Sequence, residues 1–351
     1  MGGARGPLRL PVRPLHGLHR SRLPGGDGRR TSELRHRRAG LPRQQHPDPS
    51  RGTTHPSGPH HPGLAHAAYS LLPGFQRLAW RCGQQPISPR MRVVILTSAA
   101  RGTASHHLPY LLGSERFQVV QVIHAQGHAA PKGRWRKKLR KILRIGPLGA
   151  WVGYRMRPWY SADLQALARI QDLNALCAQA GVALTNTPAV NHPRTVQAME
   201  DARADIAISL GNGYIGSKVF QVPRLGMLNI HHEILPAYQN AQGVIWPLYN
   251  GSAVTGYTIH RIDKGIDTGA IVQQREVPIH FQPTLRATVT HTMRDVLDAS
   301  AAGLRQVLDD LPTHLALARP QGPGTKWTTP TFRQYLRILR NHRALRDQRR
   351  P

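Results

Sequence analysis

The sequence predicts an α/β protein of Rossmann-like class, with a mainly parallel sheet and helices on both faces. From Met91 onward, short apolar runs alternate with helix-like stretches, which is the pattern of strand–helix–strand units. The run 205–210 is apolar almost throughout rather than alternating, as expected of a strand buried on both sides. Glycine and proline mark most of the changes from one pattern to the other.

The first part of this region supplies five expected strands. We place them at 93–97, 119–123, 182–185, 205–210 and 225–231. Helices are expected between them, at 108–112, at 161–181, from Pro193 onward and at 217–220. In the second of these helices, apolar residues recur at helical spacing after Ser161, and Gly181 ends the pattern.

The second part begins with a Leu235-Pro236 stop and a helix-like turn through Trp246. A β-rich run then leads to a glycine-punctuated loop at 263–269. A long helix from 284 to about 311 carries an apolar face that is expected to cover the sheet. After the break at 322–324, the chain is expected to end in an arginine-rich helix.

Composition divides the chain into three parts. Residues 1–90 contain 13 prolines, 15 arginines and no lysine, and lack an apolar period, so we expect disorder; alternatively, the protein starts at Met91. Residues 91–280 are the expected catalytic domain, interrupted by a basic insertion at 131–160. Residues 281–351 are expected to form a short helical C-terminal extension.

The net charge of +30 is concentrated in a few segments. Residues 1–90, 131–160 and 331–351 carry net charges of +12, +10 and +6, so the remaining body is close to neutral. The insertion at 131–160 predicts a short basic amphipathic helix. Such a helix could contact nucleic acid, an anionic membrane surface or a nucleotide-linked substrate, or it could be a solvated surface helix.

Cysteine usage and hydropathy indicate a protein of the cytoplasm. Cys82 and Cys177 are the only cysteines, which argues against a disulfide framework. No apolar run reaches the roughly 18 residues of a membrane span, and the amino terminus lacks a secretion signal. We therefore expect no membrane partner.

Polar residues gather at one end of the predicted strand 225–231. Alternate side chains of a strand face the same way, so Asn229 and His231 can point into one cleft. The glycine-rich loop that follows could bring Asp267 to the same place. His232 and Glu233 suggest a metal site at first sight, but neighbouring strand residues face opposite sides and further ligands are missing, so no metal is expected.

These motifs resemble the formyltransferases that use 10-formyltetrahydrofolate, which act on glycinamide ribonucleotide, methionyl-tRNA or amino sugars. The shared pattern is Asn-x-His, Leu-Pro, a later histidine and Asp-x-Gly-x-Asp-x-Gly, and the resemblance spans roughly 91–279. It implies the formyltransferase fold and 10-formyltetrahydrofolate as co-substrate. Asn229 and His231 would bind the developing oxyanion, and Asp267 would orient His231 and accept a proton through water.

The resemblance also implies which residues bind the two substrates. For the folate these are Gly213, Tyr214, Ile215, Gly216, Asp263, Lys264 and Gly265. For the acceptor they are Ser98, Arg101, Gly102, Asn240 and Gln242. Thr258 and His260 would support the catalytic residues. The formal G-x-G-x-x-G at 211–216 alone is a weak dinucleotide signal, because Pro236 stands where an acid would bind ribose.

The acceptor is left open between several classes. The segment after Leu-Pro offers the amides of Asn240 and Gln242 rather than a cation, and the β-barrel domain of methionyl-tRNA formyltransferases is missing. This favours a small primary amine, such as a nucleotide-linked amino sugar. Methionyl-tRNA is the alternative, supported by the basic insertion and tail. A non-catalytic folate- or RNA-binding protein and a formyltetrahydrofolate hydrolase are further alternatives.

Overall fold

The computed structural model describes residues 90–127 and 134–349, all of which fall within the unit Ala79–Pro351. The prediction of disorder in 1–90 therefore lies, except for Arg90, outside the described residues. The strands are β1 (Met91–Thr97), β2 (Phe117–Ala125), β3 (Ala183–Thr187), β4 (Ile206–Ser209), β5 (Met227–His231), β6 (Val254–Arg261) and β7 (Ile271–Pro278). The helices are α1 (Thr103–Leu111), α2 (Arg134–Met156), η1 (Arg157–Tyr160), α3 (Ala162–Leu167), α4 (Leu173–Ala180), α5 (Pro193–Asp201), α6 (Ser217–Phe220), α7 (Ile245–Tyr249), α8 (Leu285–Asp309), α9 (Leu311–Ala316) and α10 (Phe332–Asp347).

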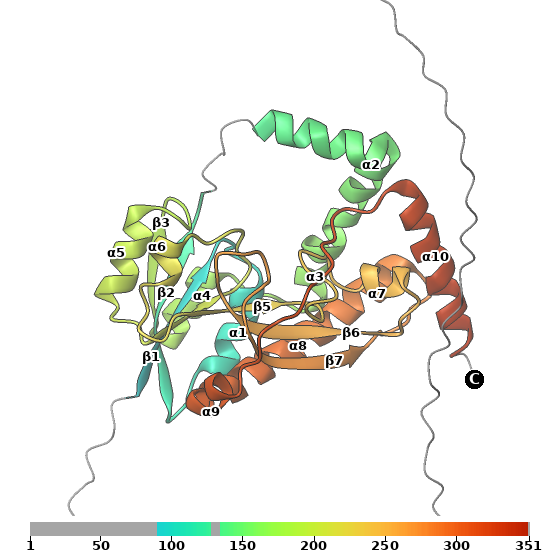
Figure 1. Cartoon of the computed structure of the whole chain (residues 1–351). Coiled ribbons are helices and arrows are strands. Elements are labelled where there is room, and N and C mark those ends of the chain that lie inside the picture. Colours follow the sequence, from blue (N-terminus) through green and yellow to red (C-terminus); the bar gives the residue numbers. More distant parts are fainter. Residues whose placement is uncertain (1–89, 128–133, 350–351) are drawn as a thin grey trace, which may run out of the picture. The chain divides into compact units, whose positions relative to one another are not determined.

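The strands form one seven-stranded sheet in the order β3-β2-β1-β4-β5-β6-β7. The first five strands of that order are parallel, and β6 and β7 extend the sheet as antiparallel strands. Helices cover both faces (Figure 1), which confirms the predicted fold class. The strand order reverses between β1 and β4. In open α/β sheets, ligands bind beside the carboxyl ends of the strands at such a reversal.

The sheet separates apolar clusters on its two faces. One cluster joins β1, β2, β4, β5 and β6 to α1, α4 and α8, and another packs β1, β4 and β5 against α5 and α6. A third cluster joins α2, η1 and α3 to α7, α8 and α10. In Figure 1 these helices lie at the end of the domain that carries β6 and β7, away from β3. Apolar burial of this kind is the main favourable contribution to folding.

Two helices differ from their predicted form. The predicted helix 161–181 is two helices, α3 and α4, because the chain turns at Arg169 with a φ of 49°. Leu164 and Leu173 are both buried, so the apolar stripe continues across this break. The insertion was predicted to form one short basic helix. The span α2 contains two short helical segments joined at Gly146, where φ is 76°, and the first segment carries most of the cations.

Gly303 allows α8 to approach the sheet closely. A Cβ at this position would collide with the Tyr257 hydroxyl and lie 2.6 Å from Oε1 of Gln273. The Tyr257 hydroxyl itself donates a hydrogen bond to that oxygen. A glycine within a helix ordinarily costs about 1 kcal/mol relative to alanine, so the close packing is the reason for its presence here.

Gly303→Ala is therefore expected to lower the free energy of unfolding by about 1–2 kcal/mol, because overpacking outweighs the gain in helix propensity. Chemical denaturation measures the change. Ala302→Gly, at the neighbouring exposed position of α8, measures the propensity difference alone. A Gly303→Ala protein more stable than the wild type would contradict the close contact.

Candidate active site

A cavity of about 610 Å³ lies at the carboxyl ends of β1, β4 and β5. Asn229, His231, His260 and Asp267 all line it, so the strand and the loop predicted to meet do so. One part of the lining, which we call the apolar lobe, consists mainly of apolar and glycine residues. Its residues are Gly213, Tyr214, Ile215, Ile262, Gly265 and Ile266. The other part of the lining, which we call the second lobe, comes from several elements. Its residues include Arg101, Gly102, Thr103, Tyr160, Leu164, Gln165, Asn240, Gln242 and Met293.

Asn229 is oriented by His260 on the neighbouring strand, and β5 and β6 place the two residues opposite each other. Nδ1 of His260 lies 2.9 Å from the carbonyl oxygen of Arg261, an acceptor, so this nitrogen carries the proton. Nε2 is then free to accept a hydrogen bond from Nδ2 of Asn229, at 3.2 Å. Burial lowers the pKa of His260, which favours this neutral form. One amide hydrogen and the oxygen of Asn229 are left for a ligand.

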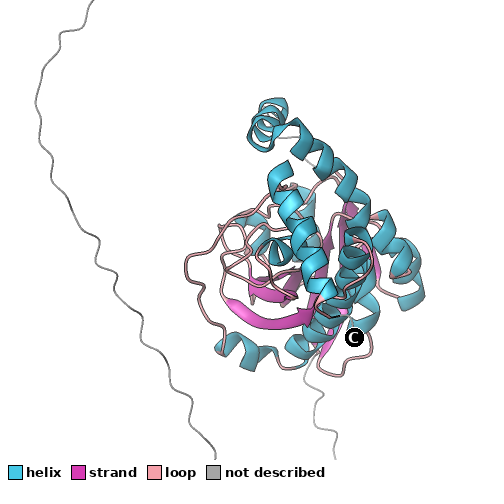
Figure 2. Ribbon diagram, turned by 90° about the vertical axis from the view of Figure 1, so that its right-hand side faces the viewer, coloured by secondary structure: helices cyan, strands magenta, loops and turns pink. Residues whose placement is uncertain are grey.

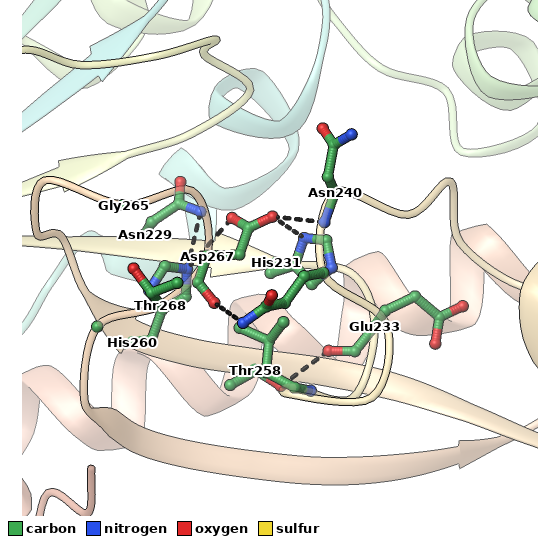
Figure 3. Close-up of polar contacts among 12 residues, drawn as sticks. Asn229, His231, Glu233, Asn240, Thr258, His260, Gly265, Asp267 and Thr268 are labelled. Atoms are coloured by element: carbon green, nitrogen blue, oxygen red, sulfur yellow. Dashed lines mark hydrogen bonds and ion pairs between the residues drawn. The ribbon is translucent and has the colours of Figure 1, made fainter. Parts of the chain in front are cut away.

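His231 is also fixed by a backbone carbonyl. Its Nε2 lies 2.7 Å from the oxygen of Tyr238 and therefore donates to it. In the neutral ring, Nδ1 is then the atom that can accept a proton. Nδ1 lies 3.6 Å from Oδ2 of Asp267, within the range of an ion pair once the ring is protonated. Figure 3 shows the carboxylate between the rings of His231 and His260.

Asp267 is positioned from two directions. The backbone N–H of Asn240 donates to its Oδ2 at 2.9 Å (Figure 3), and Nε2 of Gln239 donates to its backbone carbonyl at 3.2 Å. Asp267 and Asn240 both adopt a φ of 54°, a region that these residue types tolerate better than most. The loop around Asp267 depends on Gly265 and Gly269, because a Cβ there would collide with Thr268 and with the Arg261 carbonyl, respectively.

Several predicted ligand-binding residues have other contacts. Ser98 does not line the cavity, and its hydroxyl donates to the carbonyl of Gly211, which ties the loops after β1 and β4 together. Gly216 and Lys264 also lie outside the lining. Asp263 lines the cavity, but its Oδ1 accepts from the Gly265 N–H and the Thr268 hydroxyl, as in a tight turn.

The predicted supporting residue Thr258 and the predicted acceptor-binding residues Asn240 and Gln242 differ in their contacts. Thr258 lies outside the cavity, where its hydroxyl accepts from the Leu235 N–H and donates to the Glu233 carbonyl. The side-chain amide of Asn240 donates to the carbonyl of Trp327 in the C-terminal segment. In contrast, Gln242 lines the cavity. Its Oε1 is buried and has no hydrogen-bond partner among the described residues.

The structure also gives roles to residues that the sequence did not. His232 lines the cavity despite following His231 directly, because β5 ends at His231 and the alternation of a strand no longer applies. Burial, together with His231 and His106, lowers the pKa of His232 to about 3, so it is neutral. Among the described residues, no group of three or more His, Cys, Asp or Glu is arranged to hold a metal ion.

Glu233 is the second residue with a role that the sequence did not suggest, because its hydrogen bonds fix the backbone next to the cavity-lining Gly243. Its Oε1 accepts from the Val244 N–H at 2.6 Å and from the Thr255 hydroxyl at 3.0 Å. Val244 has a φ of 72°, which is strained for a β-branched residue, so this hydrogen bond stabilises an unfavourable backbone. Burial raises the pKa of Glu233 to about 8, so the side chain is mostly protonated at neutral pH.

One protein family and several single proteins are similar to this chain. Residues 161–308 match the family model described as formyl transferase. The chain carries a formyl transferase domain. This match contains both the Asn-x-His and the Asp-x-Gly-x-Asp-x-Gly motifs and confirms the predicted family resemblance.

The relatives align with this chain over only part of their length. Methionyl-tRNA formyltransferase of Synechococcus sp. (strain JA-3-3Ab) is 39% identical over 93 residues, which are 26% of this chain and 29% of that protein. Methionyl-tRNA formyltransferase of Deinococcus radiodurans is 42% identical over 82 residues, 23% of this chain and 26% of that protein. The chain thus spans less than a third of the length of these relatives.

Two solved structures are similar at low identity. Glycinamide ribonucleotide transformylase 1 from Symbiobacterium toebii is 17% identical with a TM-score of 0.43, covering 66% of this chain and 95% of that one. WlaRD, a sugar 3N-formyl transferase solved in the presence of dTDP and 5-N-formyl-THF, is 16% identical with a TM-score of 0.40. The similar region covers 68% of this chain and 69% of the WlaRD chain.

The raised pKa of Glu233 predicts that the free energy of unfolding depends on pH. The folded protein keeps a proton on Glu233 that the unfolded chain, with a pKa near 4.5, releases as the pH rises. The associated stabilisation is complete below about pH 4.5 and is lost as the pH rises through about 8. Glutamine mimics the protonated side chain but does not titrate.

Glu233→Gln is therefore expected to be more stable than the wild type at pH 8–9, by on the order of several kcal/mol, and similar to it near pH 4.5. Denaturant titrations across this range measure the difference. Glu276→Gln, at an exposed position of β7, is the matched control and should show no such trend. A pH-independent difference between wild type and Glu233→Gln would contradict a protonated Glu233.

Proposed function

We propose that this protein transfers the formyl group of 10-formyltetrahydrofolate to a primary amine. The observation that carries the proposal is the meeting of Asn229, His231 and Asp267 in the lining of one cavity. The family match over 161–308 supports the same reaction class.

Asn229 would stabilise the oxyanion. When the amine attacks the formyl carbon, negative charge develops on the formyl oxygen, and the free amide hydrogen of Asn229 can donate to it. Because His260 already holds the other amide hydrogen, the donor does not have to reorganise during the reaction. Preorganised donors of this kind contribute about 3–4 kcal/mol in acyl-transfer enzymes.

His231 and Asp267 would manage the protons. Attack leaves the amine nitrogen with an excess proton, and Nδ1 of His231 is the ring atom free to take it. The proton would then pass to the folate nitrogen as the bond between that nitrogen and the formyl carbon breaks, which releases tetrahydrofolate. The nearby carboxylate of Asp267 would stabilise the imidazolium and could accept the proton through water. Each of the two groups thus needs the other in place.

The apolar lobe fits the folate. Tyr214 and Ile266 line it and are 59% and 48% exposed, which is unusual for large apolar side chains. A flat heteroaromatic ring would cover them and the neighbouring Ile215 and Ile262. Gly213 and Gly265 would permit backbone approach to the ring.

The second lobe fits a small acceptor with an anionic part. Gly102, the N-cap of α1, and Thr103, its first residue, line the cavity beside Arg101, and the N-terminus of a helix favours an anionic group. Gln242 lines the same lobe, and its side-chain amide is a group that can hydrogen-bond to an amine or a sugar hydroxyl. These groups favour a nucleotide-linked amino sugar as the acceptor.

Methionyl-tRNA is the second candidate. The curated relatives given above are named methionyl-tRNA formyltransferase. The basic α2 and α10 would be available to an RNA backbone. A non-catalytic folate- or RNA-binding role would not require the aligned Asn229, His231 and Asp267.

A comparison of acceptors tests the proposal. Purified protein is supplied with 10-formyltetrahydrofolate and either a panel of nucleotide-linked amino sugars or charged initiator tRNA, and tetrahydrofolate formation is followed. We expect turnover with an amino sugar. Turnover with methionyl-tRNA alone would establish the second candidate, and folate binding without turnover on any amine would contradict the proposed activity.

A further inference from the structure

Helix α2 is strongly cationic, and seven of its eight lysines and arginines lie in the stretch 134–144. Its 23 residues include eight lysines and arginines and no acid, and the nearest acidic residue after it is Asp163. Its first half projects away from the sheet in both views (Figure 1 and Figure 2). In its second half, Val152 and Met156 are buried in the cluster shared with α8 and α10, which anchors the helix to the domain.

The rest of α2 exposes large apolar side chains. Five of the ten large apolar residues that are exposed in the described part of the chain lie on this one helix: Leu139, Leu143, Leu148, Trp151 and Tyr154. Leu143 is 74% exposed and Tyr154 is 68% exposed. Substrate binding does not explain them, because none of the five lines the active-site cavity.

A second cavity of about 710 Å³ continues this surface between α2, η1, α8 and α10. Its floor is apolar and consists of Val152, Trp159, Leu285 and Leu339. Its rim carries cations and aromatic rings: Arg155 lies 5.6 Å from the Trp151 ring centroid, and Arg157 lies 5.8 Å from that of Tyr154.

The cations on this surface are available to an anionic partner. Among the described residues, no acidic side chain forms an ion pair with Arg140, Arg144, Arg155 or Arg157. Asp163, which follows the groove residue Ala162, is bound by Arg286 at 2.7 Å. The positive charge of this surface therefore complements a partner whose surface is negatively charged.

We propose that α2 and the adjoining groove bind the surface of an anionic lipid bilayer. Leucines inserted below the headgroups lose their contact with water, whereas an RNA backbone would leave them exposed. Tryptophan and tyrosine prefer the bilayer interface, and lysine and arginine pair with anionic headgroups. The combination of leucines, aromatic rings and cations on one helix distinguishes a bilayer from RNA.

This binding is peripheral. No helix among the described residues is long and apolar enough to cross a membrane, and a helix that lies in the interface does not need to be. The inference departs from the sequence-based expectation of no membrane partner. It does not rest on the proposed formyl transfer, and either can fail without the other.

Vesicle sedimentation of the full-length protein tests the inference. Vesicles of phosphatidylcholine are compared with vesicles of equal parts phosphatidylcholine and phosphatidylglycerol, with bulk tRNA as the competing polyanion. We expect sedimentation with the anionic vesicles only, persisting when tRNA is added. Release of the protein from the vesicles by tRNA at equal phosphate would overturn the choice of lipid over RNA.

Two variants separate α2 from the basic residues elsewhere in the chain. Arg140→Glu with Arg144→Glu is expected to lower the vesicle partition coefficient at least about tenfold, and Leu143→Ser with Trp151→Ser by a similar factor. The matched controls are Arg116→Glu with Arg194→Glu, and Leu317→Ser, all at exposed positions outside α2. Circular dichroism verifies folding. Wild-type partitioning by both α2 variants, or equal losses in the controls, would overturn the proposal.

Discussion

Replacing Asn229 with alanine is expected to lower kcat for formyl transfer by about 100–1000-fold, with folate affinity close to that of the wild type. The change removes the donor to the developing oxyanion but none of the apolar residues of the folate lobe. His260 remains, and its Nε2 loses only the hydrogen bond from the Asn229 amide. Steady-state kinetics and folate titration together separate the two effects.

Asn186→Ala is the matched control, because this asparagine is exposed on β3 and does not line the cavity. It should turn over like the wild type. Near-normal kcat in Asn229→Ala would contradict its role as the oxyanion donor, and a loss confined to KM would instead indicate uniform binding of the substrate.

The second large effect concerns His231 and Asp267, which are expected to act as one unit. His231→Ala should cost at least as much as Asn229→Ala, because it removes a proton carrier as well as a donor. Asp267→Asn keeps the shape and the hydrogen bond from the Asn240 N–H but removes the charge 3.6 Å from Nδ1. It should therefore cut the rate steeply and flatten the dependence of the rate on pH.

The double variant distinguishes a unit from two independent contributions. When two groups act through each other, the loss in the double variant is far smaller than the product of the single losses. Rates of the wild type, both single variants and the double variant give the coupling. Multiplicative losses would contradict the proposed cooperation of His231 and Asp267.

The sequence predicted the frame of the site because its signals are local or periodic. Apolar runs predicted the parallel strands, and the two-residue period of a strand predicted that Asn229 and His231 face one cleft. The same period failed at His232, where the strand ends. The helical spacing of apolar residues failed between α3 and α4, because the apolar stripe continues through a turn that only the backbone of Arg169 reveals.

Contacts between distant segments could not be predicted in this way. Glu233 is held by Val244 and Thr255, and its protonation follows from a burial that no local pattern encodes. The amide of Asn240 is engaged by Trp327, 87 residues further along the chain. Asp263 carries the family's motif, yet its carboxylate closes a turn.

The most direct test of the proposed reaction follows the formyl carbon itself. 10-Formyltetrahydrofolate labelled in that carbon is incubated with the protein and an amino-sugar nucleotide, and the label is traced by NMR in the wild type and in His231→Ala. Formyl transfer predicts that the label appears on the amine nitrogen in step with tetrahydrofolate, and that His231→Ala abolishes both. Label released as formate, at the same rate with and without the amine, would contradict transfer and indicate hydrolysis.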